Sequence, residues 1–225
     1  TVREEAELEQ ALAGTQALAP ASRRLSRLVE FLDSTESEGL YGRLARWCEC
    51  CGGEYAWVFD GAEARGEGWL GRGAVVGFDV TEFLEVPALR TPITLYLFHR
   101  IRQALDGRRL VVWMDEFAKL LADPAFEGFA RDGLKTWRKL NAVAAFATQS
   151  PSDVLASPIA RTLIEQTPTK VLFPNMEAQR AEYVEGFGLS EREYELVGRE
   201  LTPGSRCFLL RQGVQGVVCE LDLKG

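Results

Sequence analysis

Residues 110–116, LVVWMDE, are the stretch from which the fold and the site of this chain are inferred. The five apolar residues have the length of a buried strand, and the acidic residues Asp115 and Glu116 follow at its carboxyl end. Ligands of open α/β sheets bind at the carboxyl ends of strands, so these acids stand where a site is expected. The alternative is that Asp115 only caps a helix that begins at Glu116.

A second apolar run, residues 142–147, also ends in polar residues, Thr148 and Gln149. One helical segment separates the two runs, so a β-α-β crossover would bring both carboxyl ends together. In nucleotide hydrolases of this layout one carboxylate holds Mg²⁺, a second polarises the attacking water, and a glutamine can bind that water and the γ-phosphate. The two strand ends therefore predict a nucleotide site, although Thr148 and Gln149 could also be a helix cap ahead of Pro151.

The rest of the chain alternates between helical and strand patterns from Pro92 onward, which predicts an α/β domain with helices on both faces of its sheet. We expect strands at 109–114, 142–147, 170–173, 207–210 and 214–223, the last two as a hairpin. We expect helices at 92–105, 123–140, 157–166 and 175–187, and one more that is capped by Ser190 and Glu193.

The residues before Pro92 follow a different pattern. Helical spacing at 3–12 and 21–32 predicts a helical appendage over residues 1–39, followed by the main domain over residues 40–225. We expect a helix at 40–48, strands at 55–59 and 74–78, and a glycine-rich loop at 61–73 between these strands.

Composition excludes several classes of protein. The formal charge is −7 and the pI is about 5.0, which argues against general electrostatic binding to nucleic acid or to an anionic membrane. No apolar run approaches the roughly 18 residues of a membrane span. The five cysteines indicate reduced thiols of a cytosolic protein. Because His99 is the only histidine, we interpret Cys48, Cys50 and Cys51 as small residues at a helix end, with zinc binding the less favoured alternative.

Basic residues supply candidates for phosphate contacts. Arg131, Lys135 and Arg138 recur at helical spacing on one face of the segment between the two apolar runs. Such a face is more often merely solvated, but it could meet phosphates of DNA or of a neighbouring subunit's nucleotide. Arg161 and Arg206 are further candidates for an arginine that acts across a subunit boundary.

The sequence contains no G-x-x-x-x-G-K-[ST] phosphate-binding loop. The closest approach, residues 128–136, has one residue too many before its lysine, and we interpret it as a helix with two glycines. The chain also begins at Thr1 without a methionine or a secretory signal. We therefore expect a segment of a longer protein, cut downstream of the phosphate-binding loop.

Several short motifs in order resemble the C-terminal ATPase domain of the CagE/TrbE/VirB family of type IV secretion and conjugation machines. The matching motifs are WMDEF (113–117), LKTWRKLN (134–141), ATQS (147–150), IEQT (164–167), FPN (173–175) and GSRCFLLRQ (204–212). The resemblance implies a RecA-like P-loop NTPase core related to FtsK and HerA, with ATP and Mg²⁺ as cofactors. It implies that Asp115 and Glu116 are the Walker B acids, with Asp115 on the metal, and that Gln149 is the sensor. Thr148 would then contact the nucleotide, and Arg206 would assist catalysis.

The resemblance also implies assembly into hexamers or smaller oligomers, at the cytoplasmic face of the bacterial inner membrane beside other secretion-channel proteins. The parent protein would hydrolyse ATP to power transfer of DNA or protein, or pilus assembly, whereas the segment alone would hydrolyse little. Two alternatives remain: a DNA-binding translocase of FtsK/HerA type that uses the basic helix face, and an assembly module with a vestigial nucleotide site.

Overall fold

The structure, a computed structural model, describes residues 1–36, 38–61, 75–121, 123–149 and 151–223, without the side chains of residues 124, 125, 131, 132, 134 and 135. It has the mixed helix and strand content that the sequence predicts. The chain forms two compact units, Thr1–Ala74 and Val75–Gly225, which are described separately below. The expected loop at 61–73 lies outside the described residues except for Gly61.

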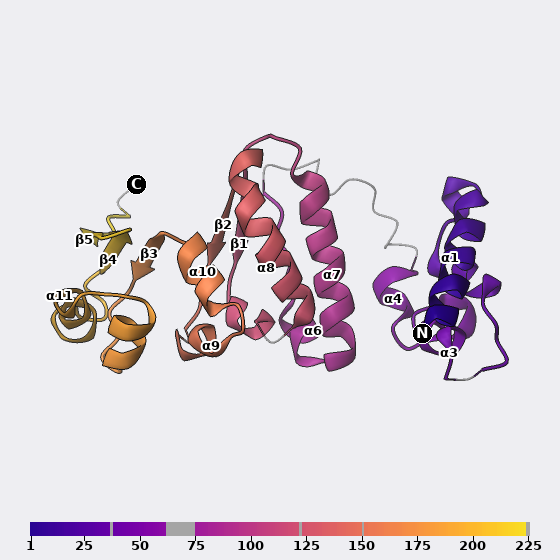
Figure 1. The fold of residues 1–225 in the computed structure, drawn as a ribbon, viewed down its shortest axis with the longest axis horizontal. Coiled ribbons are helices and arrows are strands. Elements are labelled where there is room, and N and C mark those ends of the chain that lie inside the picture. The colour runs from indigo at the N-terminus through magenta and orange to yellow at the C-terminus, as the bar shows by residue number, and fades with distance from the viewer. Residues whose placement is uncertain (37, 62–74, 122, 150, 224–225) are drawn as a thin grey trace. The chain divides into compact units, whose positions relative to one another are not determined.

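The described part of the first unit is helical (Figure 1). Its elements are α1 Val2–Ala17, η1 Pro20–Ser22, α2 Leu25–Leu28, η2 Val29–Phe31, α3 Leu40–Ala45, η3 Glu49–Cys51 and α4 Ala56–Phe59. Thr1 begins α1 with a capping box that includes Glu4. Buried Ala11 and Leu28 share one core with Cys48, and Leu44 packs against it. Residues on both sides of position 39 thus share this core, while the boundary of the expected appendage stays a prediction.

The strand expected at 55–59 is wrong, because Ala56–Phe59 forms the helix α4. The rings of Tyr55 and Phe59 lie on opposite ends of this turn, and both pack on Trp47, with centroid distances of 5.0 Å and 5.5 Å. A helical turn bonds its own backbone groups, whereas a strand here would need a partner strand. The short apolar run alone could not distinguish these two outcomes.

A buried polar cluster ties the first unit together around Asp60, which is 2% exposed. The carboxylate accepts hydrogen bonds from the backbone N–H of Ser26 at 3.2 Å, from the Ser26 hydroxyl, and from the N–H of Glu49 at 2.8 Å. Burial raises the pKa of Asp60, but the hydrogen bonds from Ser26 and Glu49 outweigh it, so the pKa is lowered overall. Asp60 is therefore a buried, fully bonded carboxylate that joins α2, η3 and α4.

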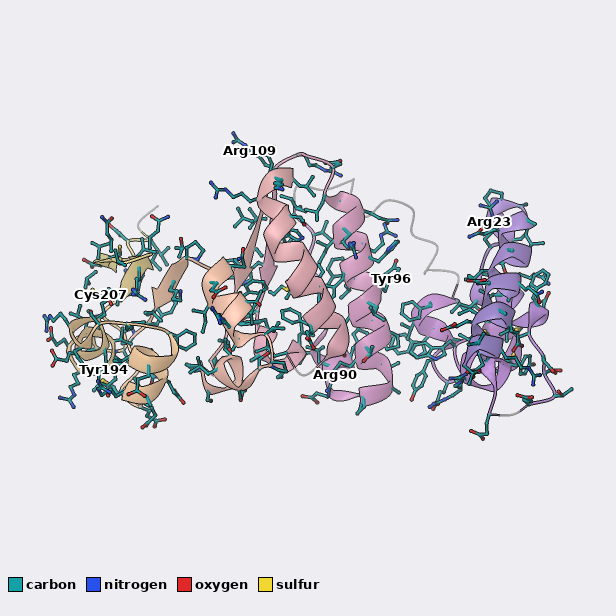
Figure 2. All side chains as sticks on the ribbon, in the orientation of Figure 1. Arg23, Arg90, Tyr96, Arg109, Tyr194 and Cys207 are labelled. Carbon is teal, nitrogen blue, oxygen red and sulfur yellow. The ribbon has the colours of Figure 1, made fainter. Side chains whose placement is uncertain are left out.

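The second unit begins with helices that precede the first strand. They are α6 Thr81–Glu85 and α7 Pro87–Ala104. Residues 75–78 form no strand, so that part of the prediction at 74–78 is wrong, and the helix expected from Pro92 begins one turn earlier at Pro87. Pro87 occupies the first helical turn, where its missing N–H costs nothing, and Pro92 lies inside the helix. Arg90, near the start of α7, donates through Nε to the carbonyl of Leu84 at 2.8 Å (Figure 2).

The expected crossover is present and confirms the central prediction. β1 Leu110–Met114 and β2 Ala142–Phe146 pair in parallel, with Leu110 opposite Ala142 and Met114 opposite Phe146. The connection contains η5 Phe117–Leu120, α8 Pro124–Trp137 and η6 Arg138–Leu140. Asp123 precedes α8 as expected, and its carboxylate accepts a hydrogen bond from the Thr91 hydroxyl of α7 at 2.7 Å.

An aromatic core fills the space between this strand pair and the helices. Phe126 is fully buried, and the rings of Phe98 and Phe129 stack with centroids 3.8 Å apart. α9 Pro151–Ala156 and α10 Ala160–Gln166 contribute Val154 and Leu163 to the same core. In Figure 1, α7 and α8 lie side by side, with α8 next to β1 and β2.

The other face of the strand pair is bare over the described residues. Val111, Trp113 and Val143 are 68%, 70% and 60% exposed. The expectation of helices on both sheet faces is therefore wrong for the described structure. The reason lies in the alternation of a strand: Leu110, Val112 and Met114 point to the aromatic core, and their neighbours point away from it.

A three-stranded antiparallel sheet completes the second unit, in the order β3-β4-β5. Its strands are β3 Thr169–Leu172, β4 Cys207–Gln212 and β5 Gln215–Glu220, and the helical turns between β3 and β4 are η7 Ala181–Gly186, α11 Glu191–Glu195 and η8 Leu196–Glu200. The expected hairpin is confirmed, with Gly213 at φ 61° in its turn. The capping box of Ser190 and Glu193 is also confirmed, but the helix expected at 175–187 is reduced to the single π-helical segment η7.

We expect Phe126→Ala to lower the free energy of unfolding of the second unit by about 3 to 5 kcal/mol, since it leaves a cavity at the centre of the aromatic core. Chemical denaturation followed by circular dichroism measures this change. Leu95→Ala is the control, because Leu95 lies on α7 and is 53% exposed. This substitution should lower the free energy of unfolding by less than about 1 kcal/mol. Equal losses in the two variants would contradict the assignment of this core.

We expect Asp60→Asn to lower the free energy of unfolding at pH 7 by about 2 to 3 kcal/mol, since hydrogen bonds to a charged acceptor are lost. The folded pKa of Asp60 is lowered, so its contribution is present above the unfolded pKa of about 3.9 and is lost as the pH falls through the folded pKa. Denaturation at pH 7 and at low pH should show that the variant loses less stability on acidification. Glu9→Gln, at an exposed glutamate of α1 in the same unit, is the control and should change neither value appreciably.

Candidate active site

The carboxyl ends of β1 and β2 are bonded to each other beyond the last paired residues. The N–H of Ala147 donates to the carbonyl of Met114 at 2.9 Å, and the N–H of Phe117 donates to the carbonyl of Ala147 at 3.1 Å. These two bonds hold the segment with Asp115 and Glu116 beside the segment with Thr148. The structure thus brings the two predicted strand ends together. Arg109, labelled in Figure 2, marks the opposite, amino end of β1.

Both predicted acids are exposed at this edge. The Asp115 carboxylate accepts a hydrogen bond from the backbone N–H of Glu116 at 2.9 Å, which turns the chain sharply after the strand. The sequence left open whether Asp115 caps a helix. The turn that follows is the short η5, and its N-cap is Glu116, which makes no side-chain capping bond. Asp115 therefore lies at the strand end with its carboxylate accessible.

Glu116 has a backbone conformation that is unusual for its residue type. Its φ of 47° and ψ of 34° lie in the left-handed region, where a side chain is disfavoured. Residues in this region are found preferentially at functional sites, where the surrounding structure holds them in place. The bond from Phe117 N–H to Ala147 holds the chain directly after Glu116. This backbone bond therefore helps to hold Glu116 in its left-handed conformation at the strand end.

Lys119 is a residue of this edge that the sequence interpretation missed. Its Nζ lies 2.9 Å from an oxygen of the Glu116 carboxylate, and the hydrogen bond to Glu116 raises the pKa of Lys119. The charge of Glu85 on α6 acts in the same direction, which places a third acid near this lysine. The i, i+3 spacing of Glu116 and Lys119 could have indicated this ion pair from the sequence. Both side chains are about half exposed, so water or a cation can compete for the carboxylate.

The polar residues after β2 occupy the expected edge. Thr148 is half-buried and Gln149 is exposed. Ser150, which lies between them and α9, is outside the described residues. The roles of Thr148 and Gln149 in nucleotide contact stay predictions, but both residues follow the strand whose end is bonded to the acidic turn.

The basic candidates are spread over several elements. Arg131 and Lys135 lie within α8, but their side chains are outside the described residues, and Arg138 is exposed in η6. Arg161 on α10 forms an ion pair with Glu165, and that hydrogen bond raises its pKa. Arg206 lies just before β4 with φ 60°, and its carbonyl accepts the N–H of Leu221. No hydrogen bond or ion pair between described residues joins any of them to Asp115 or Glu116.

The described residues contain no cluster of three or more His, Cys, Asp or Glu side chains arranged to hold a metal ion. No described helix is both long and apolar enough to cross a membrane. The segment expected to be a helix with two glycines, 128–136, lies inside α8, which confirms that it is not a phosphate-binding loop.

Comparison with known proteins places the whole chain among type IV secretion proteins. It is 44% identical over 225 residues to type IV secretion system protein virB4 of Bartonella quintana, covering 100% of this chain and 28% of that protein. It is 43% identical over 213 residues to type IV secretion system protein PtlC of Bordetella pertussis, covering 92% of this chain and 26% of that protein. The chain thus spans little more than a quarter of the length of these relatives. No protein-family model matches it.

A solved structure shares the fold. The structure of VirB4 of Thermoanaerobacter pseudethanolicus matches with a TM-score of 0.73 and 21% sequence identity, covering 99% of this chain and 64% of that chain. At this identity the match supports the arrangement of helices and strands and carries no information on individual side chains.

We expect Glu116→Gly to raise the free energy of unfolding by about 1 kcal/mol, because glycine adopts the left-handed conformation without the strain that a side chain creates. Thermal and chemical denaturation measure the change. Glu82→Gly in α6, an exposed position with ordinary helical backbone, is the matched control and should lower stability by about 1 kcal/mol or less. If both substitutions destabilise the protein equally, Glu116 is not strained.

Proposed function

Since the chain belongs to the VirB4 family of type IV secretion system proteins, we propose that it supplies the acidic half of an ATP-hydrolysing site in a longer secretion protein. The observation that carries the proposal is the bonded pair of strand ends, which sets Asp115 and Glu116 beside Thr148 at the carboxyl edge of a parallel sheet.

The donors at this edge fit Mg²⁺. They are two exposed carboxylates and a hydroxyl, and Mg²⁺ is bound through oxygen ligands, usually one or two carboxylates with water and substrate phosphates. The 225 residues do not fit the triphosphate by themselves, since they contain no phosphate-binding loop. In this proposal the longer protein supplies that loop, and a RecA-like core is completed only there.

Each residue then has one role in hydrolysis. Bound MgATP supplies an electrophilic γ-phosphate and a cation that neutralises the developing charge. Asp115 would hold the cation, and Glu116 would orient and polarise the attacking water. Gln149 hydrogen-bonds the attacking water and a γ-phosphate oxygen, and Thr148 contacts the nucleotide. Arg206 and Arg161 are the candidates to act across a subunit boundary, as is the basic face of Arg131, Lys135 and Arg138.

The exposed face of the β1–β2 pair also supports the proposal that this chain is part of a longer protein. Parallel sheets are almost always covered on both faces, yet Val111, Trp113 and Val143 are exposed here. From the family resemblance we propose that the chain works within a homo-oligomeric ATPase, peripheral to the inner membrane on its cytoplasmic side and beside other secretion-channel proteins. Its work there would be to power transfer of DNA or protein, or pilus assembly. No observation of the structure favours the DNA-translocase alternative over this function.

We expect Glu116→Gln in the full-length protein to lower kcat for ATP hydrolysis by about 10² to 10⁴, because the water loses its general base, while nucleotide binding is retained. Phosphate release and fluorescent-nucleotide binding are the two measurements. Glu177→Gln, at an exposed glutamate of the second unit, is the matched control and should leave kcat unchanged.

The isolated 225-residue chain should show little ATP hydrolysis, since no backbone cradle holds the phosphates. Robust turnover that depends on Glu116 in this chain alone would contradict the proposal. Full activity of the Glu116→Gln protein would contradict the role of Glu116, whereas no ATP hydrolysis by the unsubstituted full-length protein would support the assembly module with a vestigial site.

A further inference from the structure

A pair of neighbouring thiols lies in the first unit, outside the proposed active site. Cys50 and Cys51 are both exposed at the end of η3, and their Sγ atoms are 3.6 Å apart. The left-handed Gly52, at φ 65°, ends the turn directly after them. The two side chains therefore lie on one side of the turn, where a single atom can bridge them.

We propose that Cys50 and Cys51 form a dithiol site that chelates trivalent arsenic. Soft thiol ligands prefer soft, polarisable acceptors. With an arsenic(III) oxide R–As=O, two S–H bonds break and two As–S bonds form, and the oxygen leaves as water with both thiol protons. The condensation is balanced and needs no oxidant or reductant. The second As–S bond forms within one molecule, which gives the pair its advantage over a single thiol.

The third cysteine of the cluster does not take part. Cys48 is buried, and its Sγ donates to the carbonyl of Leu44 at 3.2 Å. Burial, with the charge of Asp60, raises the pKa of Cys48 to about 12. No group of three metal-binding side chains occurs among the described residues, so a site for tetrahedral zinc is not offered here. The two exposed thiols thus favour a bidentate ligand.

The surroundings of the pair preorganise it and connect it to the polar cluster of the unit. The backbone N–H of Cys50 donates to the Ser26 hydroxyl at 3.1 Å, and that hydroxyl is bonded to the buried Asp60. The Cys50 Sγ lies 3.7 Å from the carbonyl of Ser26, and the Cys51 Sγ lies 3.8 Å from the Tyr41 hydroxyl. Each thiol therefore has its own neighbouring group, the Ser26 carbonyl for Cys50 and the Tyr41 hydroxyl for Cys51.

The probe is phenylarsine oxide, added to the reduced, folded protein and followed by intact-mass spectrometry. We expect one adduct per chain that resists excess 2-mercaptoethanol, a monothiol, and is released by 2,3-dimercaptopropanol, a dithiol. Cys50→Ser and Cys51→Ser should each lose this resistant adduct, because a single remaining thiol gives a bond that the monothiol reverses.

Cys219→Ser is the matched control and should keep the adduct, since Cys219 lies in β5 of the second unit. Circular dichroism of each variant establishes that the fold is retained, which is expected because both substituted thiols are exposed. The proposal is overturned if either single variant retains the monothiol-resistant adduct, or if the adduct of the unsubstituted protein maps to other cysteines. Because no ATP is involved, these results are independent of the proposed hydrolytic function.

Discussion

The parallel pairing of β1 with β2 is the interaction on which the second unit and its site depend. The ladder continues past the strands through Ala147 N–H to Met114 and through Phe117 N–H to Ala147. Those bonds stop the acidic turn from swinging away from the neighbouring strand end. They also hold Glu116 in a left-handed conformation that an unsupported chain would leave. The position of the acids is thus set by backbone bonds, and both side chains stay exposed at the edge of the sheet.

One side of this strand pair is well packed and the other is exposed. The aromatic core around Phe126 draws α7, α8, α9 and α10 to a single face. The stability of the unit therefore comes from that face, while Val111, Trp113 and Val143 on the other face are exposed. The chain spans little more than a quarter of the length of its relatives, and this part has an aromatic core of its own. In the proposed function, folding and catalysis have different requirements, because folding needs the aromatic core and catalysis also needs a phosphate-binding loop.

The first unit combines a small apolar core with a buried polar cluster. Its helices are short, and its apolar core is small, with Ala11, Val29 and Cys48 among the buried members. The bonded carboxylate of Asp60 connects three segments that are far apart in sequence, which adds specificity to this small core. The backbone N–H of Cys50 donates to the Ser26 hydroxyl, so the proposed dithiol site is connected to this polar cluster.

Sequence alone determined the crossover, because the apolar runs of β1 and β2 and the amphipathic α8 between them are strong local patterns. It also determined the terminal hairpin, the Ser190 cap and the identity of the acids at the strand end. Tertiary structure decided the rest. Residues 56–59 form a helix with the rings of Tyr55 and Phe59 packed on Trp47. The exposed sheet face and the left-handed Glu116 likewise depend on neighbours distant in sequence. Such features arise from packing and long-range backbone bonds, which a local pattern of residues does not encode.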